Sequence, residues 1–121
     1  MYKDKSIVKE GKPLIKLSIP EQIKIGGFTY KVLYPYEFKE RSEIFGQSDH
    51  ALLEIRLKER DCGGVILPAA RVIECLMHEI MHCVDYVYNS QGLGEEVISR
   101  LSNGLYQVWV DHYPGGIENG R

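Results

Sequence analysis

The residues with the clearest chemical potential are His78, Glu79 and His82, which form the pattern His-Glu-x-x-His within a stretch free of Gly and Pro from Ala69 to Gln91. Such a stretch is predicted to be a helix, and imidazoles four residues apart on a helix project from one face about one turn apart. Their ring nitrogens can therefore converge on a single zinc ion at about 2.0–2.1 Å. Glu79 lies to one side of the pair, where it can accept a proton from a water held by the metal instead of binding the metal itself.

A zinc ion that activates water takes three protein ligands and one open position, so a third ligand must come from elsewhere in the chain. The candidates by residue type are Cys75, Asp85, Glu95, Glu96, His50 and His112. Cys75 and Asp85 share the helix, but each lies seven residues from one of the histidines, a rise of about 10.5 Å that one ion cannot bridge. We therefore predict that Asp85 either faces solvent or orients a metal ligand without binding the metal itself.

The acidic pair Glu95-Glu96 follows Gly92-Leu93-Gly94, a turn that predicts a second helix folded back against the first. On a helical wheel Glu95 lies beside the apolar stripe and Glu96 points away from it, so Glu95 is preferred as the third ligand and Glu96 is the alternative. Two simpler interpretations stay open. Acidic residues in a first turn suit the helix dipole, and the histidine pair could belong to an ordinary surface helix.

Alternating apolar residues predict the strands that must support this helix. Ile23–Ile25 and Phe28–Leu33 are two such runs joined by Gly26-Gly27, the pattern of a β-hairpin. A third strand is expected over Leu53–Leu57, where apolar and charged residues alternate, and Gly46–Asp49 is predicted to be a turn. We expect the third strand to be the sheet edge along which an extended peptide pairs by its main chain.

Each predicted helix carries an apolar stripe. Six residues of the first helix fall on one side at 100° per residue and are expected to face the sheet, away from the histidines: Val72, Ile73, Leu76, Ile80, Val84 and Val87. The second helix, expected from near Glu95 to before Pro114, has a stripe of Val97, Ile98, Leu101, Leu105 and Val108. The fold class predicted is α+β, with a small antiparallel sheet of about three strands packed on the histidine-bearing helix and a C-terminal helix.

Length and composition indicate one domain over residues 1–121, since 44% hydrophobic residues in 121 can build a single core. Residues 1–20 are expected to form a polar leader in which Ile15, Leu17 and Ile19 alternate as in a short strand. Residues 114–121 are rich in glycine and are expected to form a flexible tail.

The net charge of −2 is unevenly divided, with nine Lys and Arg against five Asp and Glu in residues 1–41, and six against twelve in residues 42–121. This balance argues against a protein that neutralises nucleic-acid phosphates, and the basic front is interpreted as a solvated face.

No apolar run approaches the roughly 20 residues that span a bilayer, and no signal-peptide stretch opens the chain. Three cysteines without Cys-x-x-Cys spacing fit a reducing compartment. We therefore expect a cytoplasmic protein that neither enters a membrane nor binds nucleic acid.

The histidine motif followed by a glutamate-led helix resembles the gluzincin group of zinc metallopeptidases. More closely, four segments resemble small phage and prophage proteins related to ImmA/IrrE-type metallopeptidases: Ile23–Tyr30, Gly46-Gln47 before a strand, His78–His82, and Glu95–Val108. The resemblance implies a Zn²⁺ site made by His78, His82 and a glutamate at the start of the last helix. It implies Glu79 as the general base.

These observations predict a zinc-dependent metallopeptidase, a hydrolase that cuts a peptide bond of a protein or peptide substrate. The alternative is a non-catalytic module that zinc stabilises and that acts by binding a host or phage protein through its basic front. A zinc-dependent ribonuclease is disfavoured, because those enzymes carry a third histidine close to the pair and here the next one is His112. The sequence singles out no donor for the reacting carbonyl oxygen among Tyr86, Tyr106, Tyr113 and His112.

Overall fold

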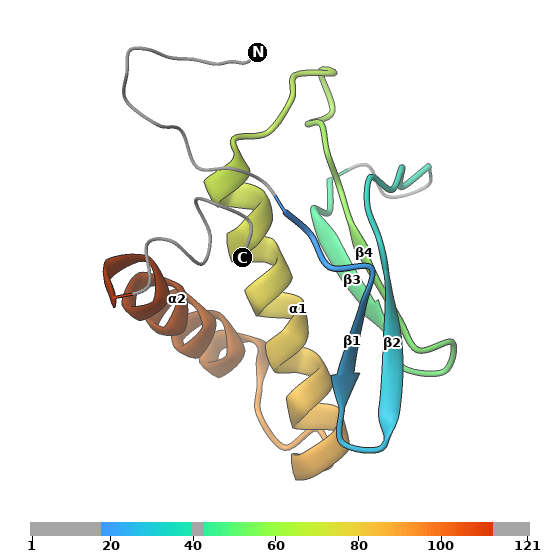
Figure 1. The fold of residues 1–121 in the computed structure, drawn as a ribbon, viewed down its shortest axis with the longest axis vertical. Helices are drawn as coiled ribbons and strands as arrows, with labels where there is room; N and C mark the ends of the chain where they lie inside the picture. Colours follow the sequence, from blue (N-terminus) through green and yellow to red (C-terminus); the bar gives the residue numbers. More distant parts are fainter. Residues whose placement is uncertain (1–17, 40–42, 113–121) are drawn as a thin grey trace.

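The computed structural model describes residues 18–39 and 43–112, which form four strands and two helices (Figure 1). In chain order the elements are β1 (Gln22–Ile25), β2 (Phe28–Leu33), β3 (Gly46–Asp49), β4 (Glu54–Leu57), α1 (Ala69–Asn89) and α2 (Glu95–His112). The α+β class is confirmed, as are the expected hairpin and both helices, with boundaries within two residues of those predicted.

The sheet corrects the predicted topology, because it is four-stranded and mixed instead of three-stranded and antiparallel. Its order is β1-β2-β4-β3, in which β2 and β4 run parallel and the two outer pairs are antiparallel. The additional strand is β3, which was predicted to be a turn. Its sequence has low strand propensity, and it is extended because it pairs along its length with β4, from Gly46 opposite Leu57 to Asp49 opposite Glu54.

The strand order also shows that the predicted edge was wrong. Strand β4 lies between β2 and β3, so both of its edges are already hydrogen-bonded. Within the described residues, β3 has a strand on one side only, and it also contacts α1. The edge strands of the described sheet are therefore β1 and β3, and both contact α1.

The hairpin between β1 and β2 depends on Gly26. Ile25 pairs with Phe28 across the two-residue turn, and Gly26 has a φ of +63°, a conformation that residues with a side chain rarely adopt. A Cβ at this position would also lie 2.7 Å from Cγ1 of Val87 on α1. Glycine therefore permits both the turn and the close approach of the hairpin to α1.

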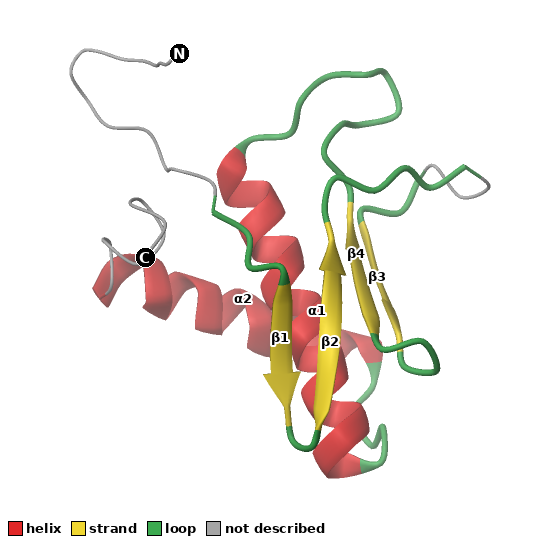
Figure 2. Cartoon of the chain, turned by 45° about the vertical axis from the view of Figure 1, so that its right-hand side comes forward, coloured by secondary structure: helices red, strands yellow, loops and turns green. Residues whose placement is uncertain are grey.

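The elements form three layers, in which α1 packs across one face of the sheet and α2 packs on α1 (Figures 1 and 2). The core between α1 and the sheet consists of Ile25, Tyr30, Val32, Ile55, Leu57, Val72, Leu76 and Cys83.

The apolar stripe predicted for α1 was partly wrong, because Val84 is exposed and Cys83 is fully buried. The side of α1 that faces the sheet runs through positions 72, 76, 79 and 83, so it includes Glu79.

Helix α2 is less buried than its sequence predicted. Only Ile98 and Ser102 are buried, whereas Leu101, Leu105 and Val108 of the predicted stripe are exposed. The reason is that α2 contacts α1 alone and no strand among the described residues. Val97, Tyr106 and Val110 are half-buried, so α2 is covered along a narrow strip and exposes much of its apolar side.

Two expectations about the ends of the chain fall outside the described residues, namely the tail over 114–121 and nearly all of the leader over 1–20. Of the short strand expected there, only Ile19 is described, and it belongs to no strand. Neither described helix combines the length and apolarity that crossing a bilayer requires.

Candidate metal centre

Helix α1 places His78 and His82 on one face, as the spacing predicted. Their Nε2 atoms lie 3.2 Å apart and their ring centroids 4.8 Å apart. The helix continues uninterrupted through both residues, so neither ring depends on a loop for its position. Both rings are partly exposed and line the same cavity.

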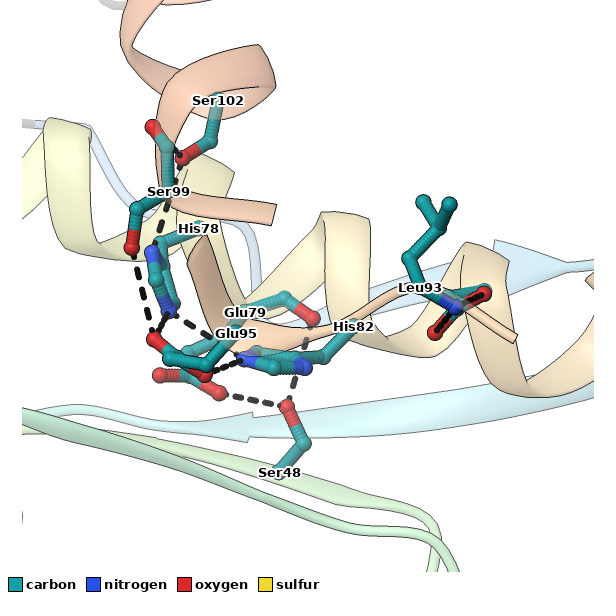
Figure 3. Close-up of polar contacts among 9 residues, drawn as sticks. Ser48, His78, Glu79, His82, Leu93, Glu95, Ser99 and Ser102 are labelled. Carbon is teal, nitrogen blue, oxygen red and sulfur yellow. Dashed lines mark hydrogen bonds and ion pairs between the residues drawn. The ribbon is translucent and has the colours of Figure 1, made fainter. Parts of the chain in front are cut away.

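The carboxylate of Glu95, at the first position of α2, bridges the two imidazoles. Its Oε2 is 2.8 Å from Nε2 of His78, and its Oε1 is 2.9 Å from Nε2 of His82 (Figure 3). Glu96 points elsewhere, since its side chain is 87% exposed and pairs with Arg100 at 3.4 Å. Of the two glutamates that the sequence left open, the structure brings Glu95 to the histidines.

These three residues form a group that could hold one metal ion. Their ligand atoms all lie within 4.8 Å of one another, and the three closest separations are 2.8, 2.9 and 3.2 Å. Ligands around a tetrahedral zinc ion at about 2.0–2.1 Å are roughly 3.3 Å apart, so small rotations of the side chains suffice to admit an ion. Two imidazoles and one carboxylate are also a ligand set of catalytic zinc sites. The donor set is therefore one that could hold a zinc ion.

Asp85 holds the turn that brings Glu95 back to α1. Its carboxylate accepts hydrogen bonds from the backbone N–H of Leu93, at 3.2 and 3.3 Å, and from Nδ2 of Asn89 at 2.9 Å. Its backbone carbonyl accepts the N–H groups of Ser90 and Gln91, both in the left-handed conformation. Asp85 is buried, which corrects the expectation that it faces solvent. Its carboxylate bonds to Asn89 and Leu93, so any support that it gives the ligands comes through the turn. A polar residue one turn before a helix end was the available signal for this role.

Glu79 is buried at the contact between α1 and β3, with only 7% of its surface exposed. Ser48 of β3 donates a hydrogen bond of 2.6 Å from its Oγ to Oε1 of Glu79 (Figure 3). Burial raises the pKa of the Glu79 carboxyl above its ordinary value, while the Ser48 hydroxyl and the neighbouring histidines act in the opposite direction. The sequence predicted Glu79 beside the metal, but it gave no sign of Ser48, because β3 was not predicted to be a strand.

Ser102 of α2 contacts His78 at Nδ1, the ring nitrogen that faces away from Glu95. Its fully buried Oγ donates to the backbone carbonyl of Ser99 at 3.2 Å and lies 3.5 Å from Nδ1 of His78. The hydroxyl proton is thus directed to Ser99, so the oxygen can accept Nδ1–H of His78. With Nδ1–H given to Ser102, Nε2 would be the nitrogen that His78 presents to a metal ion. No functional role was predicted for Ser102.

His50 follows β3 and lies in the wall of the same cavity. Its Nδ1 is 2.9 Å from the hydroxyl of Tyr30, and its ring stacks on Tyr86 with centroids 4.1 Å apart and planes 6° apart. Burial lowers the pKa of His50 and the nearby His82 lowers it further, while Asp49 acts in the opposite direction. The lowered pKa favours the neutral imidazole. His50 and His112, considered above as third ligands, do not belong to the group that could hold a metal ion.

The cavity that contains these groups has a volume of about 710 Å³, within the range of small-molecule and peptide sites. It is bounded by β3 on one side and by the facing sides of α1 and α2 on the other. Of the four residues considered as donors to the carbonyl oxygen, Tyr86, Tyr106 and His112 do not line this cavity, and Tyr113 lies outside the described residues.

Comparison of the chain with family models, with curated proteins and with solved structures finds no match. The function must therefore be inferred from the chemistry of the site.

Proposed function

We propose that this protein is a zinc-dependent metallopeptidase of the gluzincin type, in which His78, His82 and Glu95 bind the ion and Glu79 is the general base. The substrate class we propose is a protein or peptide. The observation that carries this proposal is the position of Glu79. A carboxylate that is almost fully buried, yet opens into the same cavity as the three metal-binding side chains, is suited to proton transfer more than to stabilising the fold.

A bound zinc ion would supply two things, a lower pKa for the attacking water and polarisation of the scissile carbonyl. Glu79 accepts the proton of the water as the water oxygen bonds to the carbonyl carbon. The same carboxyl then returns that proton to the leaving nitrogen as the C–N bond breaks. Ser48 holds Oε1 of Glu79, which keeps the second oxygen of the carboxylate directed to the reacting atoms.

We place the substrate backbone along the edge of β3 that pairs with no strand among the described residues. An extended peptide that pairs with an edge strand gains main-chain hydrogen bonds that do not depend on its side chains. Gly46 and Ser48 of this strand line the cavity beside Glu79. A peptide bound along β3 would therefore pass directly over the general base.

The test is proteolysis by the zinc-loaded protein of a peptide library, with the products sequenced by mass spectrometry. Zinc content by elemental analysis should be one ion per chain. Glu79→Gln should keep the fold and the zinc but lose cleavage by at least about 10²-fold, the usual contribution of general-base catalysis. A library left uncut by the fully loaded protein, or cut equally by Glu79→Gln, would overturn the proposal.

A second candidate is a non-catalytic binding module in which zinc fastens α2 to α1. The observation that favours it is the poor burial of α2, which presents Leu101, Leu105 and Val108 to solvent. An exposed apolar helix side can mark a contact surface. The Glu79→Gln variant separates the two candidates, because a binding module would keep its full biological effect.

A further inference from the structure

The proposed mechanism leaves the reacting carbonyl oxygen without a protein hydrogen-bond donor. Such a donor must lie in the cavity wall, be held in a fixed orientation and have an N–H or O–H group that the protein itself does not use. Among the described residues that line the cavity, His50 meets these conditions. It lies just past Asp49, the last residue of the strand that carries Ser48.

The orientation of the His50 ring is fixed from two directions. Tyr86 covers a face of the ring by parallel stacking at 4.1 Å, and Tyr30 contacts Nδ1 at 2.9 Å. Tyr30 is fully buried, so its hydroxyl has no access to solvent. A ring fixed by a face and by one nitrogen has little freedom to rotate, and its remaining nitrogen is Nε2.

The hydrogen bond from Tyr30 determines which nitrogen of His50 carries the proton. The available partners of the Tyr30 hydroxyl are Nδ1 of His50 and the thiol of Cys83. Sulfur is a weak acceptor and an imidazole nitrogen a strong one, so donation of the hydroxyl to Nδ1 is the favoured arrangement. A neutral imidazole that accepts at Nδ1 has its proton on Nε2. No hydrogen bond within the described residues uses that proton.

We propose that His50 is a further catalytic residue of this site, which donates Nε2–H to the carbonyl oxygen of the substrate as negative charge develops on it. This assignment rests on the proposed hydrolysis. Tyr30 and Tyr86 are positioning residues, because they act only through the ring of His50. A donor fixed in advance loses little free energy to reorganisation when the charge forms, which is why such donors act mainly on kcat.

The test combines steady-state kinetics with a measurement that does not require turnover. The kinetics are measured on the zinc-loaded protein with a peptide that it cleaves. His50→Ala should lower kcat by about 10²–10³-fold, while KM and zinc content each stay within about threefold of the wild-type value. His50→Gln, whose amide N–H lies near the position of Nε2–H, should recover part of the rate. His112 is an exposed histidine outside the cavity, so His112→Ala should leave kcat unchanged.

The measurement that does not require turnover is nitrogen-15 NMR of the histidine side chains. It should show His50 protonated at Nε2, and Tyr30→Phe should disturb that tautomer.

Two results would overturn the role of His50 alone. One is a His50→Ala protein that cleaves the peptide at a rate within threefold of wild type, or that differs in KM only. The other is a wild-type protein whose His50 carries its proton on Nδ1. If the NMR result is as expected but the loaded wild-type protein cleaves nothing, the hydrolase proposal has failed, and the assignment of His50 fails with it.

Discussion

Gly46 of β3 and Glu79 of α1 approach so closely that a Cβ on Gly46 would lie 3.1 Å from Oε2 and 3.2 Å from Cγ of Glu79. The missing side chain allows the edge strand to pass directly over the buried carboxylate. Ser48, two residues further along β3 and on the same side of the strand, donates to the other oxygen. Strand β3 therefore both makes room for Glu79 and orients it.

Gly46→Ala should displace Glu79 while leaving the fold intact. The added methyl group forces a shift of a few tenths of an ångström or more, and small misplacements of a catalytic group can cost up to about 10²-fold in rate. We expect kcat to fall at least about tenfold, with a loss of about 1–3 kcal/mol in the free energy of unfolding. Gly104→Ala is the matched control, because its Cβ would meet nothing within 4 Å. Equal kcat in wild type and Gly46→Ala would contradict this role of Gly46.

Glu95→Gln should weaken zinc binding strongly, whereas Glu96→Gln should not. The first variant removes the negative charge that lies 2.8 and 2.9 Å from the two imidazoles, and the second removes an exposed charge that pairs with Arg100. Competition with a zinc chelator measures the dissociation constant. For Glu95→Gln we expect the zinc dissociation constant to increase by more than about 100-fold. That is a larger change than the loss of a residue that only orients a ligand would cause. A similar loss in both variants would exclude Glu95 as a specific ligand.

Ser102→Ala should reduce zinc affinity by about 10–100-fold, the usual effect of removing a group that orients a metal-binding histidine. The hydroxyl lies 3.5 Å from Nδ1 of His78, and its loss leaves the tautomer of that ring unspecified. The same chelator competition reports the change, and thermal unfolding of the zinc-free protein controls for packing. Ser102→Thr keeps the hydroxyl, so it separates loss of the hydrogen bond from a change of volume. Unaltered affinity in Ser102→Ala would mean that His78 needs no such support.

Asp85→Ala should destabilise the turn between the helices. Its carboxylate is buried and accepts N–H groups of Leu93 and Asn89, which would lose their partner. Hydrogen bonds to a charged group contribute about 1.5–3 kcal/mol, so the free energy of unfolding in urea should fall by about 2 kcal/mol or more. Glu96→Ala removes the same charge from the surface and should change stability by less than about 0.5 kcal/mol. Zinc affinity should also fall in Asp85→Ala, because Glu95 follows that turn.

The thiols of Cys75 and Cys83 should be slow to alkylate at pH 8, because burial raises the pKa of each to about 11. The thiolate is the reacting form, and at pH 8 it is only about 10⁻³ of the total for such a pKa. Their rates should rise about tenfold per pH unit until the pH approaches 11. Exposed Cys62 should be modified first, as peptide mass spectrometry after iodoacetamide can show. Modification of all three thiols at one rate would contradict the structure.

The local elements were predictable because each depends on residues close together in the chain. The spacing of His78 and His82 sufficed to place two imidazoles on one side of a helix, and Gly26-Gly27 between alternating runs sufficed for the hairpin. The helical wheel also favoured Glu95 over Glu96. It succeeded because a first-turn residue beside Ile98, which is fully buried, must point toward α1.

The sequence by itself determined the helices, the hairpin and the residue types of the site, since periodicity and turn chemistry act over a few residues. Only the tertiary structure decided that Gly46–Asp49 is a strand, because its extended form depends on pairing with β4 and not on its own propensity. It also decided the partners of Glu79 and His50, which are Ser48, Tyr30 and Tyr86 from distant parts of the chain. Such contacts follow from how the layers pack, and no local pattern in the sequence encodes them.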